Sequence, residues 1–134
     1  MRGQTAFEYI LIFSIVMLMA LILTTYAGEM TQRNQEDIRV SDAITAVNKV
    51  VEAANIVSTQ GVPSQITLSV LIPDEIRLIN ITGNTILMKV GISSGVTDIF
   101  AASKSQLQGY VSNSSGYRSI KITAEGTYVN ITEG

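Results

Sequence analysis

Residues 8–28, EYILIFSIVMLMALILTTYAG, decide the fold class of this chain. After Glu8, the run from Tyr9 to Gly28 holds twenty residues without a charge or a proline. A helix rises about 1.5 Å per residue, so this run would span roughly 30 Å, the thickness of a bilayer's hydrocarbon core. Its few polar side chains carry hydroxyls, which can bond back to the helix: Ser14, Thr24 and Thr25. The run therefore predicts a membrane-spanning helix.

Two other interpretations of this run fit less well. A buried core helix would have to be enclosed on all sides, and the rest of this 134-residue chain is too small for that. A cleaved secretory signal has an apolar stretch of about 7–15 residues, followed by a small-x-small cleavage site. Here the stretch is longer, and Thr25-Tyr26-Ala27 is a poor cleavage site. We therefore expect the run to persist in the working protein.

The chain continues from Glu29 to Gln60 without proline or glycine. Apolar residues recur there at spacings of three and four in two overlapping rows, which together form a broad stripe on one helix face: Val40, Ile44, Val47, Val51 and Ala54, and Ala43, Val47, Val50, Ala54 and Val57. Gly61 and Pro63 then end the pattern. The sequence predicts one long helix over residues 4–60, with a hydrophobic first half and an amphipathic second half.

From Gly61 onward the hydrophobic period changes from 3.6 to 2. Short β-branched segments follow one another, separated by turn signals such as TGN, SSG and NSSG. Six or seven strands at this spacing predict an antiparallel sheet folded over itself as a sandwich or small barrel. The expected fold class is α+β, in which the long N-terminal helix packs on a β-rich head domain of residues 61–134.

The composition excludes most catalytic and nucleic-acid-binding functions. Cys and His are absent, which removes thiolate chemistry, the usual general base and the commonest metal ligand. The net charge is −2 with acids and bases scattered, so no basic surface for nucleic acid is indicated. Asp74 and Glu75 adjoin a proline in a turn, where acids are ordinary. We expect no enzyme, no metal, no cofactor and no nucleic-acid partner.

One short motif recurs in the expected head. Asn80-Ile-Thr82, Asn113-Ser-Ser115 and Asn130-Ile-Thr132 each match the N-x-[ST] acceptor of N-glycosylation. All three lie after Gly61, and none lies in the helix. We expect N-linked glycans at one or more of them, with Asn113 the most accessible because it lies in the NSSG turn.

The N-terminal residues add a more specific signal. RGQTAFEYILIF resembles the class III, prepilin-like signal of archaeal type IV pilins: a Gly, a Gln that begins the mature chain, and a Glu as fifth mature residue before a hydrophobic helix. On this pattern Gly3 precedes the cleaved bond, Gln4 becomes the first residue, and Glu8 is the fifth. The resemblance covers the helix closely and the head only as architecture.

This resemblance implies a subunit of an extracellular filament. A precursor would wait in the cell membrane, head outside, until a prepilin peptidase removed the short leader of residues 1–3. Glu8 would then pair with the new α-amine of a neighbouring subunit, and the pilus assembly machinery would build a homopolymeric helical filament at the cell surface, used for adhesion or attachment. Residues 1–3 are shorter than the family's basic leader, so either the leader is short or the start codon lies upstream.

Two alternatives remain open at this point. An archaellin-like subunit of a motility filament would share the helix and the β head, although the Gln4 and Glu8 pattern favours the pilin. A membrane-anchored surface protein that does not polymerise would also carry the apolar helix.

Overall fold

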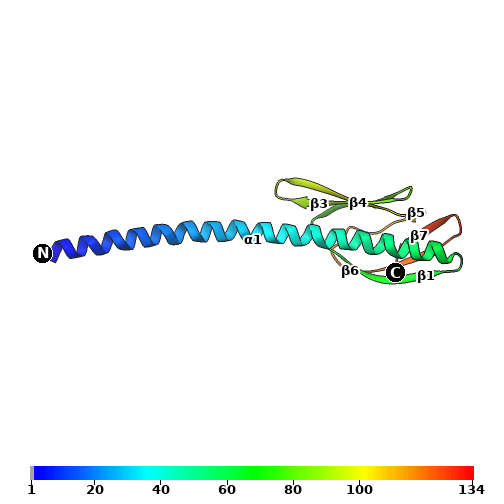
Figure 1. The fold of residues 1–134 in the computed structure, drawn as a ribbon, viewed down its shortest axis with the longest axis horizontal. Coiled ribbons are helices and arrows are strands. Elements are labelled where there is room, and N and C mark those ends of the chain that lie inside the picture. Colours follow the sequence, from blue (N-terminus) through cyan, green and yellow to red (C-terminus); the bar gives the residue numbers. More distant parts are fainter. Residues whose placement is uncertain (1) are drawn as a thin grey trace. The chain divides into compact units, whose positions relative to one another are not determined.

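The computed structural model describes residues 2–134, with side chains described from Gly3 onward. It has one helix in these residues, α1 (Arg2–Gln60), and seven strands (Figure 1). The strands are β1 (Gln65–Ile72), β2 (Ile76–Thr82), β3 (Thr85–Ile92), β4 (Gly95–Ala102), β5 (Gln106–Gly109), β6 (Gly116–Ala124) and β7 (Tyr128–Glu133). This confirms the predicted α+β class and the order of a long helix before a strand-rich domain.

The chain divides into two compact units inside the helix. The first unit ends at Glu36, and the second runs from Asp37 to Gly134. The second unit therefore contains all seven strands together with the C-terminal part of α1. The hydrophobic period changes at Gly61, but the second unit begins well before that residue. The reason is that side chains of the helix form part of the core of this unit.

The helix ends where the sequence predicts. Gly61 has a φ of 74° and donates its N–H to the carbonyl of Val57 at 3.0 Å. A left-handed residue just after the last helical turn is a common helix end, and glycine adopts it without a steric penalty. The chain then turns, with the N–H of Ser64 donating to the Gly61 carbonyl at 2.8 Å, and enters β1.

The buried face of α1 in the second unit is built from small side chains. Four alanines and four valines are each at most 7% exposed: Ala43, Ala46, Val47, Val50, Val51, Ala53, Ala54 and Val57. This agrees with the predicted stripe except at Ile44, which is 44% exposed. The buried face extends toward Ala46 and Ala53 on one flank of the helix and stops short of Ile44 on the other.

The seven strands form two sheets. One has the order β1-β6-β7-β5, and the other has the order β2-β3-β4. The expected antiparallel pairing holds for every pair except β5 and β7, which run parallel. The small-barrel alternative is wrong, because the sheets do not close. Strands β5 and β2 are edge strands of the two sheets. Near them, the N–H of Leu107 in β5 donates a hydrogen bond to the carbonyl of Gly83, which follows β2, at 2.7 Å.

The parallel pair arises because the chain has already changed sheets when it forms β5, on the far side of β7 from β6. The chain leaves β4 in one sheet and forms the short β5 at the edge of the other. It then crosses to β6, and β7 later fills the position between β6 and β5 and pairs with β5 in parallel. Gly109, at the end of β5, has a φ of 133°, and a Cβ at this position would overlap the carbonyl of Ile131 in β7. Only glycine allows the two strands to approach this closely.

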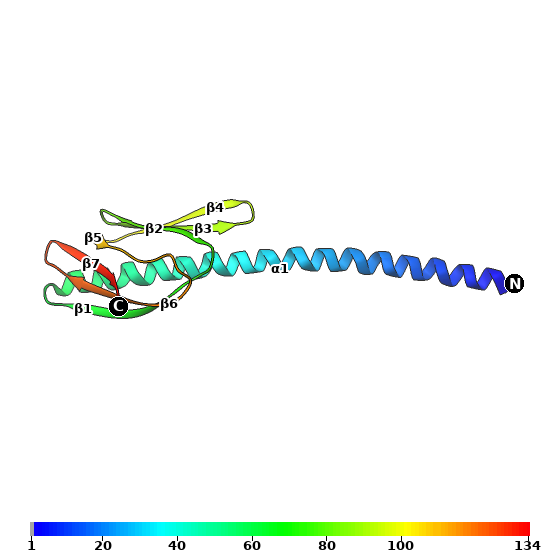
Figure 2. The ribbon, with the colours of Figure 1, turned by 180° about the vertical axis from the view of Figure 1, so that it is seen from behind.

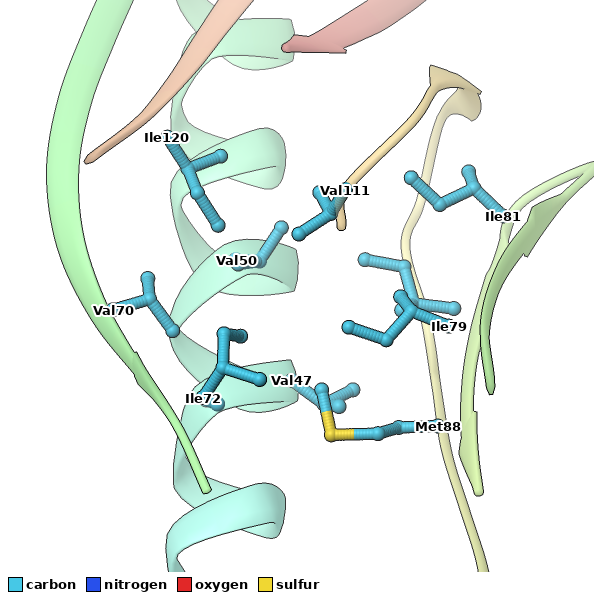
Figure 3. Close-up of a pocket in the computed structure, with 11 residues that line it drawn as sticks. Val47, Val50, Val70, Ile72, Ile79, Ile81, Met88, Val111 and Ile120 are labelled. Atoms are coloured by element: carbon cyan, nitrogen blue, oxygen red, sulfur yellow. The ribbon is translucent and has the colours of Figure 1, made fainter. Parts of the chain in front are cut away.

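Strands β1 and β6 lie on one side of the C-terminal part of α1, and the sheet β2-β3-β4 lies on the other (Figures 1 and 2). In Figure 3, Val47 and Val50 of the helix lie between Val70 and Ile72 of β1 on one side and Ile79 and Met88 on the other. Small helix residues thus meet apolar side chains from both sheets. They leave an apolar cavity of about 20 Å³, lined only by hydrophobic side chains and too small for an organic ligand.

A polar cluster ties the helix to the chain between β4 and β5. The Oδ1 atom of Asn55 accepts hydrogen bonds from the Ser103 hydroxyl and from the Lys104 N–H, each at 2.8 Å. Ser103 is only 4% exposed. The hydroxyls of Ser58 and Ser105 also share a hydrogen bond. A buried polar group is costly when unpaired, so Asn55 fixes the place where the chain passes from one sheet to the other.

We therefore expect Asn55→Ala to destabilise the second unit. The change leaves the Ser103 hydroxyl and the Lys104 N–H without their acceptor, which costs about 1–3 kcal/mol of unfolding free energy. Chemical denaturation of the detergent-solubilised full chain measures it. Asn48→Ala is the matched control on the exposed side of the same helix, with an expected change within about 0.5 kcal/mol. Equal effects at both positions would contradict the role of Asn55.

A second link joins α1 to the turn between β1 and β2. The Nε and Nη2 atoms of Arg39 lie 2.9 and 3.2 Å from the two carboxylate oxygens of Asp74. The Nη1 atom of Arg39 also lies 3.5 Å from the carbonyl of Gly91. Hydrogen bonding from Arg39, together with its charge, holds the pKa of Asp74 below its ordinary value of 3.8. The two-pronged geometry aligns the helix with this end of both sheets.

This pair predicts a loss of stability in acid. Because the pKa of Asp74 is lower in the folded chain, its stabilisation is full above the unfolded value of 3.8 and disappears as pH falls through the folded value. The Asp74 side chain is 69% exposed, so the effect is about 1 kcal/mol or less. Between about pH 6 and pH 3, wild type should lose more unfolding free energy than Asp74→Asn.

Asp98→Asn is the control for this measurement. Asp98 faces Lys89 at 3.5 Å, and both of these side chains are well exposed, so it removes a carboxylate from a looser ion pair. This variant should keep the acid sensitivity of wild type. If Asp74→Asn has the same pH dependence as wild type, Asp74 is not a source of the acid sensitivity.

Candidate functional site

The first unit presents an apolar helix surface that its own chain does not cover. Every described large hydrophobic residue from Phe7 to Tyr26 is exposed, from 49% at Leu11 to 72% at Tyr9. None of the most apolar stretch of α1 is buried in the structure. By length and composition the helix can cross a membrane.

Hydroxyl groups in this surface are already satisfied within the helix. The Ser14 hydroxyl donates to the carbonyl of Ile10 at 2.7 Å. Thr24 and Thr25 donate in the same way to carbonyls three and four residues earlier, at 2.8–3.2 Å. These groups need no outside partner, so the helix offers lipid or protein an apolar surface on all sides.

Glu8 is exposed, just before the uncharged run. Among the side chains that the structure describes, from Gly3 onward, none forms an ion pair or hydrogen bond with it. Gln4 lies one helical turn earlier, so the two positions share a face of α1. A carboxylate at the edge of an apolar surface is costly in lipid or in a helix bundle unless a cation meets it. Gly3 and Gln4 are exposed within the first turns of the helix, and Met1, the first residue of the expected leader, lies outside the described residues.

The three candidate acceptor asparagines occupy different environments. Asn80 is exposed on β2, a strand at the edge of its sheet. Asn113 is exposed between β5 and β6, but its Nδ2 atom lies 3.4 Å from the carbonyls of both Ile76 and Arg77. Asn130 is half-buried on β7, between β6 and β5. The structure does not bring the three together.

An apolar patch that the sequence pattern did not predict lies on the outer face of β2-β3-β4. Phe100 is 73% exposed there and Leu78 is 44% exposed. Because side chains alternate along β4, Phe100 lies on the face of the sheet away from the buried Ile99. Only the strand register shows which residues of the neighbouring strands lie beside Phe100.

Comparison with protein-family models, curated proteins and solved structures finds no match to this chain.

The expected processing site can be tested without disturbing the fold. A Cβ added at Gly3 meets nothing in the folded chain, so Gly3→Val should be tolerated there. If a peptidase cuts after Gly3, mass spectrometry of the native protein gives Gln4 as the first residue, and the Gly3→Val precursor accumulates uncut. Gly28→Ala is the control, because its added Cβ also meets nothing and it should be processed normally. An intact Met1, or a terminus near Ala27, would end this interpretation.

Proposed function

We propose that this protein is the structural subunit of an archaeal type IV pilus, an extracellular filament for surface attachment that polymerises through its N-terminal helix. The observation that carries the proposal is the combination of an apolar helix surface, uncovered in its own chain, with a single unpaired acid at its start. A membrane anchor alone explains the apolar surface. An acid at the edge of an anchor can reach the headgroups, so what the anchor leaves unexplained is the spacing of Gly3, Gln4 and Glu8.

The helix is suited to two successive environments. In the membrane, acyl chains cover residues 9–28 before assembly. In the filament, identical helices replace the acyl chains, and the surface remains apolar on every side in both states. The second unit supplies a folded head whose core lies between Ala43 and Ile131 and does not need the first unit for its own packing.

Glu8 gives the assembly its register. Removal of residues 1–3 would create a positively charged α-amine on Gln4, four residues from the position of the acid. If the helices run side by side, pairing this amine with Glu8 of a neighbour offsets the two helices by about 6 Å. Burying both ions costs nearly as much as their attraction returns, so the pair selects one offset and adds little net stability. A repeated head-to-tail offset does not close, and it propagates as a helical filament.

Substitution of Glu8 tests the proposal directly. Glu8→Gln keeps the size and hydrogen-bonding capacity of the side chain but removes its charge, and Glu8→Leu removes a charge that is costly in lipid. Both precursors should insert in the membrane with folded heads, while filaments become sparse or absent. Electron microscopy of sheared extracellular material and immunoblotting of membrane fractions measure the two effects.

Glu125→Gln is the matched control, since it removes one exposed acid from the turn before β7 and should leave filament yield unchanged. Normal filament yield from both Glu8 variants would refute the role of Glu8. Protein that remains wholly with membranes in wild-type cells would instead favour an anchored surface protein that does not polymerise.

A further inference from the structure

The outer face of the sheet β2-β3-β4 is a grid whose rows are given by the strand register. Asn80 lies opposite Leu87, which lies opposite Phe100. The row beside it is Leu78, Lys89 and Asp98, and the row on the other side is Thr82, Thr85 and Ala102. Residues directly opposite in antiparallel strands point to the same face of the sheet. The three rows are two residues apart along each strand, so all of them lie on the outer face.

The centre of this face is apolar. Phe100 is 73% exposed, Leu78 is 44% exposed, and Leu87 is half-buried between them. Their inward neighbours Ile86, Met88 and Ile99 already form the core, so the outer side chains do not contribute to it. We name Leu78, Leu87 and Phe100 the outer patch. Contiguous exposed apolar side chains often mark a surface that another group covers, whereas single exposed ones need no explanation.

Asn80 lies at the edge of the outer patch, and its side-chain amide, the group that would accept a glycan, is unbonded within the described part of the chain. Asn80 and Thr82, the two residues that define its N-x-[ST] motif, are both exposed on this same face. Within residues 2–134 the Asn80 side chain makes no hydrogen bond. The other two candidates differ from it: Asn113 is also exposed, but its Nδ2 atom is directed at two strand carbonyls, and Asn130 is half-buried in an interior strand.

We propose that Asn80 is the principal N-glycan acceptor of this protein, and that the attached sugar covers the outer patch. The proposal rests on the extracellular head of the proposed function. In the modification, the Nδ2 nitrogen of Asn80 bonds to the anomeric carbon of a phosphate-activated sugar donor. The bond from that carbon to the phosphate oxygen breaks, the phosphate leaves with the electron pair, and Nδ2 loses one proton.

The geometry of the sheet suits a sugar better than a free partner. Neighbouring strands lie about 4.8 Å apart, so Phe100 is roughly 10 Å from Asn80 across Leu87, within reach of the first two sugars of a chain. The C–H face of a pyranose ring is apolar and can stack on an aromatic ring, while its hydroxyls remain in water. Covalent attachment holds the sugar at a high local concentration over the outer patch without any further binding energy.

Glycopeptide analysis of the native full-length protein tests the first part. Asn80 should carry most of the glycan, and Asn113 and Asn130 much less. Three variants each remove one acceptor motif with little change in shape: Thr82→Val, Ser115→Ala and Thr132→Val. Only Thr82→Val should remove most of the glycan mass. A bare Asn80, or a glycan carried chiefly by Asn113 or Asn130, would overturn the proposal.

Binding of a fluorescent hydrophobic dye tests the cover. Loss of the glycan in Thr82→Val or Asn80→Gln should raise dye binding several-fold, and adding Phe100→Ser to either variant should return it to the wild-type level. Ser115→Ala and Thr132→Val should bind dye like wild type. Unchanged dye binding after loss of the glycan would show that something else, such as a second copy of the chain, covers the outer patch, and would overturn this part.

The outcome is separable from that of the proposed function. Glycopeptide analysis can be made on protein extracted from membranes as well as on filaments. A glycosylated Asn80 in cells without filaments would support this inference and count against the pilus. Abundant filaments with a bare Asn80 would do the reverse.

Discussion

An apolar helix surface that its own chain leaves uncovered is the constraint on which the rest of the protein depends. Burial of apolar area is worth roughly 25 cal/mol per Å², so a surface running from Phe7 to Tyr26 must be covered by lipid, by protein or by both in turn. This demand explains the absence of charge from Tyr9 to Gly28 and the hydroxyls that bond back to the helix. It also makes an acid at the edge of the surface expensive, and hence informative about a partner.

In the second unit, most of the apolar side chains of the same helix are buried by the chain itself. From Ala43 to Val57 its buried side chains are alanine and valine, and isoleucines of the two sheets pack against them. Small residues on a central helix allow two sheets to approach it closely. Arg39 and Asn55 add directional contacts, to the turn between β1 and β2 and to the chain between β4 and β5. The head is therefore completed by the helix, although the strands follow it in the sequence.

The outer face of the head is less constrained, and that is where the proposed modification lies. Core packing requires Ile86, Met88 and Ile99 to point inward, but it does not require Leu87 and Phe100 to be apolar. Asn80 and these two residues come from three strands and meet in one row only because the strands pair in this register. The proposed modification joins a glycosylation motif and a hydrophobic patch that are each weak signals when taken separately.

The amino-acid sequence by itself determined the elements: a helix ending at Gln60, strands close to the seven observed, and the position of Glu8 before the uncharged run. These follow from local periodicity and from the conformations of Gly61 and the turn residues, which act over a few residues. Only the tertiary structure decided the parallel pairing of β5 with β7, the exposure of Ile44, and the contacts of Arg39 and Asn55. Each depends on which distant segments meet, and a one-dimensional pattern shows that a residue has an inward face without showing what lies against it.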